Sequence, residues 1–492
     1  MKNAAVSNSG RRVATTGKTA LAVALAAFAF ATPAMAQDSF SIDEDAMFGS
    51  EDMVETVTES AAGSAVQSLL VSESVRVGGR FTGSADASWT WNDPWEGDFD
   101  ITAPDDYGLV PSLSSLLFFD ARPTEESRFY GSMKASWPFS ASAGVLDSDG
   151  DATGDTVSLP NIEIFELFSD FSWNDSLYFR FGKQTVNWGV GYFFSPANIL
   201  NLQEIDPTDP TAQLEGPVAL RALYPIPGTQ HNLWAYTVFD AATMKPEDTA
   251  VAAKAEFVFG GWELGVGGYY QKDDPIRGML TASGSVGQFS VFGEATVARG
   301  SDRSWVTSVS SALAASGFVA TKTDDESIFF QGTTGFRYTN SDANITVMGQ
   351  YLYDGEGYPN ADREARITEA QDNETAIKAF LALADPTADV DAAFSGFLKG
   401  LIYGSGRHYA AATFSKSELL VEDLSFSLFA MGNLSDLSGY VKPTLSYSFF
   451  DGMSLSTSAS FAVGFDDGEY VVLNDGRALS LSISLTLGSG AF

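Results

Sequence analysis

The chain contains no cysteine and only two histidines in 492 residues. Without thiols it cannot form a disulfide scaffold, a cysteine nucleophile, a cysteine-ligated metal site or a lipidated N-terminal cysteine. His231 and His408 lie in strand-like segments, and serine is so frequent that a pairing of either histidine with a serine would carry little information. We therefore expect no enzymatic activity and no cofactor.

Basic residues are scarce. The chain has 28 Lys and Arg against 63 Asp and Glu, which gives a formal net charge of −35. A surface of this sign repels nucleic acid and anionic membrane surfaces. We expect no nucleic-acid partner, and we interpret most acidic residues as solvated loop positions.

After the N-terminus the sequence lacks any apolar run of about 18 residues, the length that a transmembrane helix needs. The N-terminus itself has the parts of a secretory signal peptide: a basic region, an apolar core at 19–31 and the small-x-small site Ala34-Met35-Ala36. We predict a signal peptide over 1–36. Residues 37–73 are acidic and poor in strand patterns, so we expect a tail or a small plug there.

From Ser74 onward, segments with two-residue alternation follow one another to the C-terminus. In the last one the odd positions 479–487 are Leu or Ile and the even positions 480–486 are Ser or Thr, without charge on either face. One apolar and one hydroxyl face are typical of a strand between lipid and a polar lumen. We predict eighteen strands, or sixteen if the weakest segments (112–121 and 216–224) are not strands: 74–92, 112–121, 126–137, 160–173, 176–188, 216–224, 231–240, 249–259, 262–272, 276–283, 288–299, 326–339, 344–353, 406–416, 423–432, 438–450, 453–464 and 478–488.

The connections between these segments alternate between short and long. The long ones are 93–111, 138–159, 189–215, 300–325, 354–405 and 465–477, with the short 273–275 as an exception. Tight turns at one end and longer loops at the other are typical of bacterial outer-membrane barrels. We therefore predict an all-β fold, a transmembrane antiparallel β-barrel over 74–492, in the outer membrane of a diderm bacterium.

Three of the long connections carry additional patterns. Segments 362–384 and 388–402 have helical spacing and are separated by Asp385-Pro386, and a further short helix is expected near 310–316. Residues 189–215 are rich in Pro, Asp and Asn, and we interpret them as a loop able to fold inward as a constriction.

One acidic run is a weak metal candidate. Asp147, Asp149 and Asp151 resemble part of a calcium loop, because carboxylates at alternate positions can converge on a hard cation. However, Ala152 stands where such a loop needs glycine, and Ser158 stands where it needs a bidentate glutamate. We expect a solvated turn and assign no metal site.

Residues 179–201 resemble a strand and loop of several outer-membrane barrel families, including the DUF1302 barrels of unknown function and porin-like channels selective for alginate or phosphate. In these families a strand ends in Gly-(Arg/Lys)-Gln, and Trp-Gly and then Phe-x-Pro leading to Asn follow. The matching residues are Gly182, Lys183, Gln184, Asn187, Trp188, Gly189, Phe194, Pro196 and Asn198. The acidic stretch before a Gly-Ser-rich first strand also resembles spirochaetal barrel proteins. The resemblance implies a barrel and says little about a substrate.

A ring of eighteen strands is wide enough for an aqueous channel unless a segment fills it. We expect a porin-like channel for passive or facilitated diffusion of small solutes, with Arg180, Gln184 and Lys442 facing the lumen. The alternatives are a non-transport surface or envelope-structural barrel of adhesin type and, least favoured, a barrel-embedded hydrolase. Expected partners are outer-membrane lipid, small solutes and the barrel assembly machinery, which commonly recognises a terminal aromatic such as Phe492, although Phe492 is out of phase with the leucines of the last strand.

Overall fold

The computed structural model describes residues 75–491 except 93, 96–98, 125, 147–151, 175, 201–204, 211–213, 241–242, 244, 385–388, 403, 405, 451 and 475. The predicted signal peptide (1–36) and N-terminal tail (37–73) lie outside the described residues, as does Phe492. The weak metal candidates Asp147, Asp149 and Asp151 also lie outside them. These four expectations therefore stay predictions.

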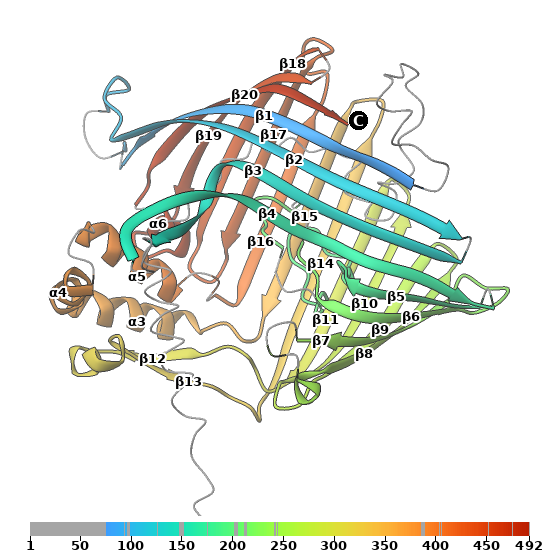
Figure 1. Ribbon diagram of the computed structural model, residues 1–492. Helices are drawn as coiled ribbons and strands as arrows, with labels where there is room; N and C mark the ends of the chain where they lie inside the picture. The colour runs from blue at the N-terminus through green and yellow to red at the C-terminus, as the bar shows by residue number, and fades with distance from the viewer. Residues whose placement is uncertain are drawn as a thin grey trace, which may run out of the picture.

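Eighteen strands form one antiparallel sheet that closes on itself (Figure 1), because each strand pairs with the next and β20 pairs back with β1. Closure removes the unpaired strand edges that lipid cannot hydrate. The strands are β1 (Val75–Trp91), β2 (Asp106–Thr124), β3 (Ser127–Leu146), β4 (Ala152–Trp173), β5 (Leu177–Lys183), β6 (Val218–Pro225), β7 (Asn232–Phe239), β8 (Ala250–Phe259), β9 (Trp262–Tyr270), β10 (Ile276–Val286), β11 (Phe289–Arg299), β14 (Ile328–Asn340), β15 (Ile345–Asp354), β16 (His408–Lys416), β17 (Leu424–Asn433), β18 (Ser438–Phe450), β19 (Met453–Val463) and β20 (Leu479–Ala491).

The prediction of eighteen strands is confirmed, and each predicted segment overlaps one of them. Some boundaries were wrong. The predicted loop 138–159 is mostly strand, because β3 and β4 continue as a hairpin as far as 146 and from 152 onward. The loop 93–111 is also shorter than predicted, since β2 begins at Asp106, and β5 ends at Lys183 instead of 188. Pro138 and the many Gly and Asp residues of this hairpin predict a loop. In the structure, pairing between β3 and β4 outweighs that local preference.

The strands have an apolar outer face and a polar inner face. Hydroxyl pairs join neighbouring strands inside the ring: Ser458 with Ser482 at 2.6 Å and Ser446 with Ser456 at 2.8 Å. On the opposite face of β20, Ile483 and Leu487 are exposed. Exposed large apolar residues recur on the outer face of strands around the ring, among them Phe81, Leu113, Leu117, Phe181, Leu233, Leu264, Val266, Leu280, Phe336 and Leu445. A polypeptide with this outer surface is suited to lipid.

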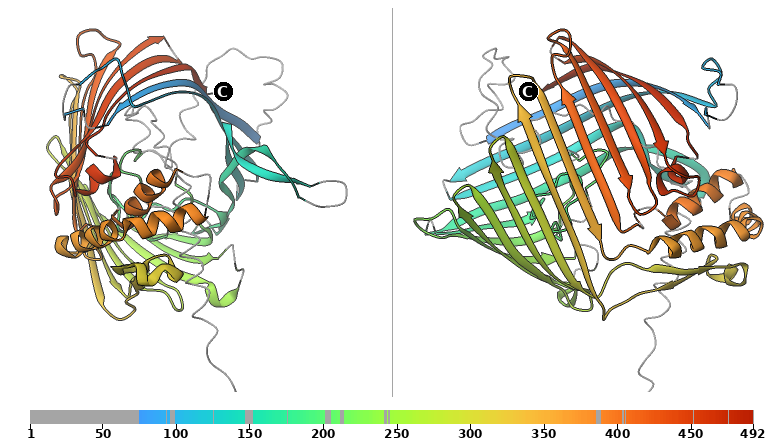
Figure 2. Two further views of the ribbon diagram at one scale, coloured as in Figure 1. Left: turned by 90° about the vertical axis from the view of Figure 1, so that its left-hand side faces the viewer. Right: turned by 180° about the vertical axis from the view of Figure 1, so that it is seen from behind.

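The long connections gather at one end of the barrel and carry short elements of their own, which partly cover the opening there (Figure 2). We name this group the cap: the hairpin β12 (Trp305–Val309) and β13 (Val319–Lys322), the 3-10 helix η4 (Ser311–Ser316), and the helices α3 (Asn360–Asp372), α4 (Glu374–Ala384), α5 (Val390–Ile402) and α6 (Glu469–Leu473). A further 3-10 helix, η3 (Pro246–Asp248), lies between β7 and β8. Among the described helices, none is long and apolar enough to cross a bilayer.

The cap confirms the predicted helices in part. The short helix near 310–316 and the helix at 388–402 are present as η4 and α5. The predicted single helix 362–384 is two helices, because the chain breaks at Asn373, whose backbone N–H instead caps the end of α3. The hairpin β12–β13 and helix α6 were not predicted; both are too short to establish a clear period in sequence. Apolar side chains from η4, β13, α3, α4 and α5 form a common core, which includes Phe318, Ile367, Ile377, Phe394 and Phe397.

Candidate functional site

The candidate site begins where β5 ends, at Gly182 and Lys183. Gly182 has φ +136°, and a Cβ there would lie 2.2 Å from the carbonyl oxygen of Leu167. Only glycine adopts this backbone conformation without strain. The strand ladders on both sides of β5 run through Gly182 without a shift in register. The Lys183 ammonium pairs with the Glu215 carboxylate near the end of the following loop region.

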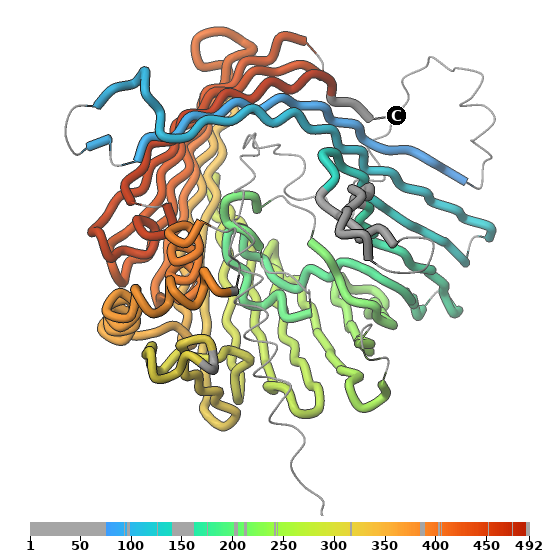
Figure 3. The backbone as a smooth tube through the Cα atoms, turned by 60° about the vertical axis from the view of Figure 1, so that its left-hand side comes forward, coloured from blue at the N-terminus to red at the C-terminus, as the bar shows by residue number. Residues whose placement is uncertain are grey.

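After β5 the chain enters the barrel and runs along its inner wall (Figure 3). We name the described residues of this connection (184–200, 205–210 and 214–217) the inward loop. Its first half packs on β6, β7, β8 and β10, where Trp188 meets Tyr236 and Met279. Further along, Phe193 packs on β15, β16 and β17, in contact with the cluster of Met348, Tyr409 and Phe429. The described part of the loop thus lines the inner wall over β6 to β8, β10 and β15 to β17.

A buried carboxylate on β11 holds the middle of the inward loop. Glu294 is 6% exposed and accepts hydrogen bonds from the backbone N–H groups of Val190, Gly191 and Ala197, the last at 2.8 Å. The Ser195 hydroxyl donates to the same carboxylate at 3.0 Å. Converging N–H groups of this kind stabilise an anion without a cation beside it. Glu294 therefore fixes the curvature of the loop.

Gln350 on β15 makes a second attachment. Its Oε1 accepts from the backbone N–H groups of Tyr192 at 3.0 Å and Phe193 at 2.7 Å, and its Nε2 donates to the carbonyl oxygen of Phe194. Nε2 also donates to the Thr333 hydroxyl at 2.7 Å, which sets the orientation of the amide. Both hydrogen-bonding ends of one side chain are thus used to fix the loop.

Gly189 shows why the loop needs glycine at this position. A Cβ at this position would lie 1.7 Å from Ser195 Oγ and 2.7 Å from Glu294 Oε1. The loop backbone can therefore approach the carboxylate only without a side chain. Asn198 Oδ1 accepts from the backbone N–H of Trp188 at 3.3 Å, which connects the two ends of this turn. The residues singled out by the family resemblance therefore build an inward turn.

Opposite these attachments, the inward loop leaves a recess between itself and the inner face of β1 to β4. This lumen recess has a volume of about 730 Å³. Its charged lining residues are Arg80, Lys134, Glu163, Lys183, Asp209 and Glu215. Cations and carboxylates stand in equal number, so the recess offers a solute contacts of both signs.

A row of ion pairs crosses the inner wall over β2 to β5. Asp120 binds Arg128 at 2.9 Å, and Asp170 binds Arg180 at 2.6 Å. The Arg180 guanidinium also lies 3.7 Å from the ring centre of Phe168, which is a cation–π contact. Arg180 is thus on the inner wall, but it is held by Asp170 and Phe168.

The other two predicted lumen residues have different surroundings. Gln184 is completely buried, and its Nε2 donates to the carbonyl oxygen of Ala219 at 3.0 Å, so this first residue of the inward loop packs against β6. Lys442 is half-buried and lies across the β17–β18 ladder from Phe429, whose ring contacts the loop residue Phe193. The structure therefore does not bring Arg180, Gln184 and Lys442 into one cluster.

Neither histidine has catalytic surroundings among the described residues. His231 Nδ1 accepts from the backbone N–H of Val258 at 3.1 Å, and its ring lies against Phe257 and Phe259. His408 Nδ1 is 2.7 Å from the Tyr351 hydroxyl. Both are surrounded by aromatic side chains, as in the aromatic girdles of membrane barrels.

Glu294 and Gln350 were missed in the sequence, although a signal was present. Each is the only carboxylate or amide residue in the interior of its strand and directly follows glycine, as Gly293-Glu294 in β11 and Gly349-Gln350 in β15. A polar residue in such a strand is expected to face inward and to have a buried partner. What the pattern does not contain is the identity of that partner.

Comparisons with known proteins find similar solved structures, all at low sequence identity. No protein-family model and no curated protein matches the chain, so the resemblance to DUF1302 has no support. Solved structures do match: OccAB1 of Acinetobacter baumannii (13% identity, 86% of this chain and 98% of that chain, TM-score 0.45) and OccK8 (OprE) of Pseudomonas aeruginosa (9%, 85% and 99%, TM-score 0.44). A third is a loop-deletion mutant of OmpT, an outer membrane protein of Vibrio cholerae (8%, 85% and 99%, TM-score 0.36). None of the three supports the spirochaetal likeness, and the fold itself is established by the closed strand pairing.

Proposed function

We propose that this chain is a porin-like channel of the outer membrane, through which small solutes diffuse passively or by facilitated diffusion. The lumen recess is the observation that carries the proposal. The inward loop is fixed to the wall at Glu294 and Gln350, and it leaves about 730 Å³ open beside β1 to β4. A segment that simply plugged the barrel would have no need of a recess lined by charges of both signs.

The membrane placement rests on the two faces of the sheet. Apolar side chains are exposed on the outside while hydroxyl groups and ion pairs lie inside, which is the reverse of a soluble barrel. The predicted signal peptide and barrel assembly machinery would bring the chain to this location. Soluble recovery of the folded protein without detergent would contradict the placement.

We propose that solutes contact the wall through its charged groups instead of a single tight site. Lys134 is exposed to the lumen recess and faces Glu163 on the neighbouring strand. Arg180 and Lys442 would add positive charge further along the wall. Paired charges at intervals attract polar solutes without binding them strongly, which allows both entry and exit. The acidic loops would raise the local concentration of cations at the mouth.

Single-channel conductance in planar bilayers tests the proposal. The full-length chain, folded in detergent, is expected to give stepwise conductance. Ser114→Trp, which fills the lumen recess, is expected to lower the step size. The matched variant Leu117→Trp lies on the outer face of the same strand and is expected to leave it unchanged. Equal steps in both variants would contradict the role of the recess.

Two alternatives make different predictions. A folded protein without conductance, both intact and with the 355–407 connection deleted, would favour a surface or envelope-structural barrel. A hydrolase would need His231 or His408 to act on substrate, and their aromatic surroundings support the non-enzymatic interpretation. Single replacement of each histidine in lipase and peptidase assays distinguishes this case.

A further inference from the structure

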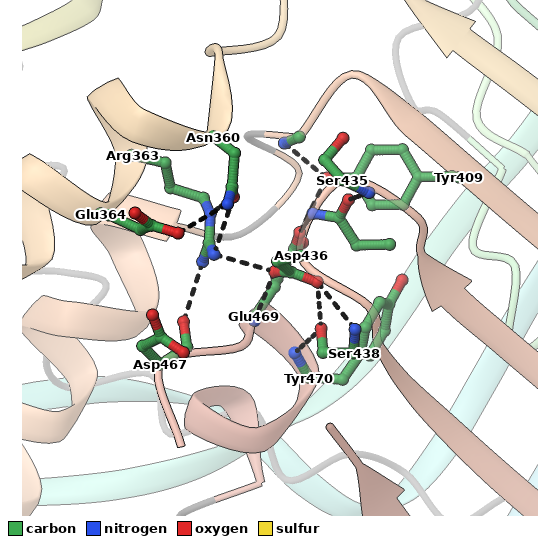
Figure 4. A network of polar contacts seen from close by, with 12 residues as sticks. Asn360, Arg363, Glu364, Tyr409, Ser435, Asp436, Ser438, Asp467, Glu469 and Tyr470 are labelled. Carbon is green, nitrogen blue, oxygen red and sulfur yellow. Dashed lines mark hydrogen bonds and ion pairs between the residues drawn. The ribbon is translucent and has the colours of Figure 1, made fainter. Parts of the chain in front are cut away.

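A buried polar cluster joins the cap to the barrel rim (Figure 4). Arg363 of α3 pairs with Asp436 of the β17–β18 turn at 3.1 Å, and both side chains are at most 3% exposed. Arg363 also donates to the carbonyl oxygen of Asp467 at 3.1 Å. The same Asp436 carboxylate accepts from the backbone N–H of Glu469 at 2.8 Å. One carboxylate thus connects α3 with the start of α6.

Glu469 itself is the least solvated acid of this cluster, at 1% exposure. Its Oε1 accepts from the backbone N–H of Gly404, between α5 and β16, at 2.9 Å. Its Oε2 accepts from the Tyr409 hydroxyl of β16 at 2.8 Å and from Asn433 Nδ2 of β17 at 2.7 Å. The Glu469 side chain therefore ties α6 to the end of α5 and to two barrel strands.

The carboxylate of Glu469 has no ion-pair partner within the described part of the chain. Arg363, the nearest cation in the network, is bound by Asp436 and by Asn360 Oδ1. The titratable groups that act on Glu469 are Asp436 from the β17–β18 turn and Tyr409 from β16, while Arg363 of α3 acts through Asp436. An ionised carboxylate in this position is therefore desolvated without compensation from a cation.

Burial raises the pKa of the Glu469 carboxyl to about 7, although its hydrogen-bond donors lower it, and the Asp436 carboxylate adds to the rise. A hydrated glutamate titrates near pH ~4.3. Between the two values the buried carboxyl holds a proton that a hydrated one has lost. The arrangement with Glu469 buried is therefore favoured fully below about pH 4.3, and this preference is lost as the pH rises through about 7.

We propose that Glu469 is a proton-controlled latch, which holds the cap on the barrel rim tightly when its carboxyl is protonated and loosely when it is ionised. Ionisation favours any displacement of the cap that brings water to the carboxylate. The ratio of seated to displaced cap changes by at most roughly tenfold per pH unit between the two titration points. The effect on conductance rests on the proposed channel function, whereas the movement of the cap does not.

Paired spin labels measure the movement directly, because the chain has no cysteine of its own. One label is placed at Leu383→Cys in α4 and the other at Leu420→Cys in the turn at the opposite end of the barrel; both residues are exposed. The full-length protein in lipid nanodiscs is titrated from about pH 4 to about pH 8.5, a range that spans both titration points. A second distance population is expected to grow as the pH rises toward the pKa of about 7 and to level off above it.

Variants separate the latch from general effects of pH. Glu469→Gln is neutral at every pH and is expected to keep the seated distance throughout, whereas Glu326→Gln, an exposed acid at the same end, is expected to titrate like the wild type. Asp436→Asn removes the repelling neighbour and releases Arg363, so the midpoint is expected to fall below the wild-type value.

Three outcomes would overturn the proposal: wild-type distances that do not depend on pH, a Glu469→Gln protein that still titrates, or an unchanged midpoint in Asp436→Asn. The wild-type titration alone is decisive if Glu469→Gln does not fold. A protein whose cap titrates but which gives no conductance would support the latch and reject the channel. A protein that conducts but whose cap does not move would support the channel and reject the latch.

Discussion

The Glu294 carboxylate accepts a hydrogen bond from the backbone N–H of Ala197 at 2.8 Å, across 97 residues of sequence. The contact attaches the inward loop, which has no regular secondary structure, to the regular strand β11. A loop inside a water-filled barrel loses its shape unless its backbone groups find partners, because water competes for each of them. Glu294 supplies several acceptor sites on one rigid strand.

Replacement of this carboxylate is expected to free the loop. Glu294→Ala leaves the N–H groups of Val190, Gly191 and Ala197 without their acceptor. We expect a loss of about 1–3 kcal/mol in the free energy of unfolding, together with larger and noisier single-channel steps. Thr296→Ala, two residues along the same inner face and also buried, is the matched control and is expected to change neither quantity strongly. Wild-type noise in Glu294→Ala would show that the loop is held by other contacts.

Gln350→Leu is expected to act on the same loop and therefore to be coupled to Glu294. Each single replacement detaches one part of the segment between Val190 and Ala197. Once one attachment is lost, the other restrains a loop that is already mobile. The double variant is therefore expected to lose less free energy of unfolding than the two single variants together, by about 0.5–3 kcal/mol. Thermal unfolding followed on heat-modifiable gels measures the cycle. Additive effects would mean that the two attachments are independent.

The sequence predicted the barrel well because its signal is repeated around the whole ring. The alternation of 479–487 with 480–486 is one of eighteen such patterns, and each strand needs only its own residues to show which face meets lipid. Local patterns of this kind are complete within ten residues or so.

The candidate site was less predictable because its contacts join distant segments. Glu294 meets residues 190–197, and Glu469 meets Gly404 and Asn433, with nothing in any one segment that names the other. Gln184 shows most clearly what the sequence could not predict. Its inward position followed from the pattern, but the loop that buries it is a tertiary feature. Strand extension beyond the barrel, as in β3 and β4, was likewise hidden by proline and glycine.

The charge of the lumen recess is expected to set ion preference. Lys134→Glu changes the balance of the recess by two units of charge toward negative. We expect the reversal potential in a salt gradient to shift toward cation selectivity, with a larger shift at low ionic strength because screening is weaker there. Glu422→Lys, in the exposed turn between β16 and β17, is the control for charge remote from the recess. An equal and opposite shift in the control would mean that surface charge alone determines selectivity.

The last strand offers a matched test of its two faces. Ile483→Lys places a charge on the exposed outer face of β20, where a lysine in hydrocarbon costs about 2–4 kcal/mol near the bilayer midplane. Ser482→Lys places the same side chain one residue away on the inner face, beside Ser458 and water in the lumen. We expect a clear loss of folding free energy in lipid vesicles for Ile483→Lys and a much smaller one for Ser482→Lys. If the barrel were water-soluble, Ser482→Lys would lose more folding free energy than Ile483→Lys, because the outer face would then be the hydrated one. The sign of the difference therefore tests the membrane placement independently of any conductance.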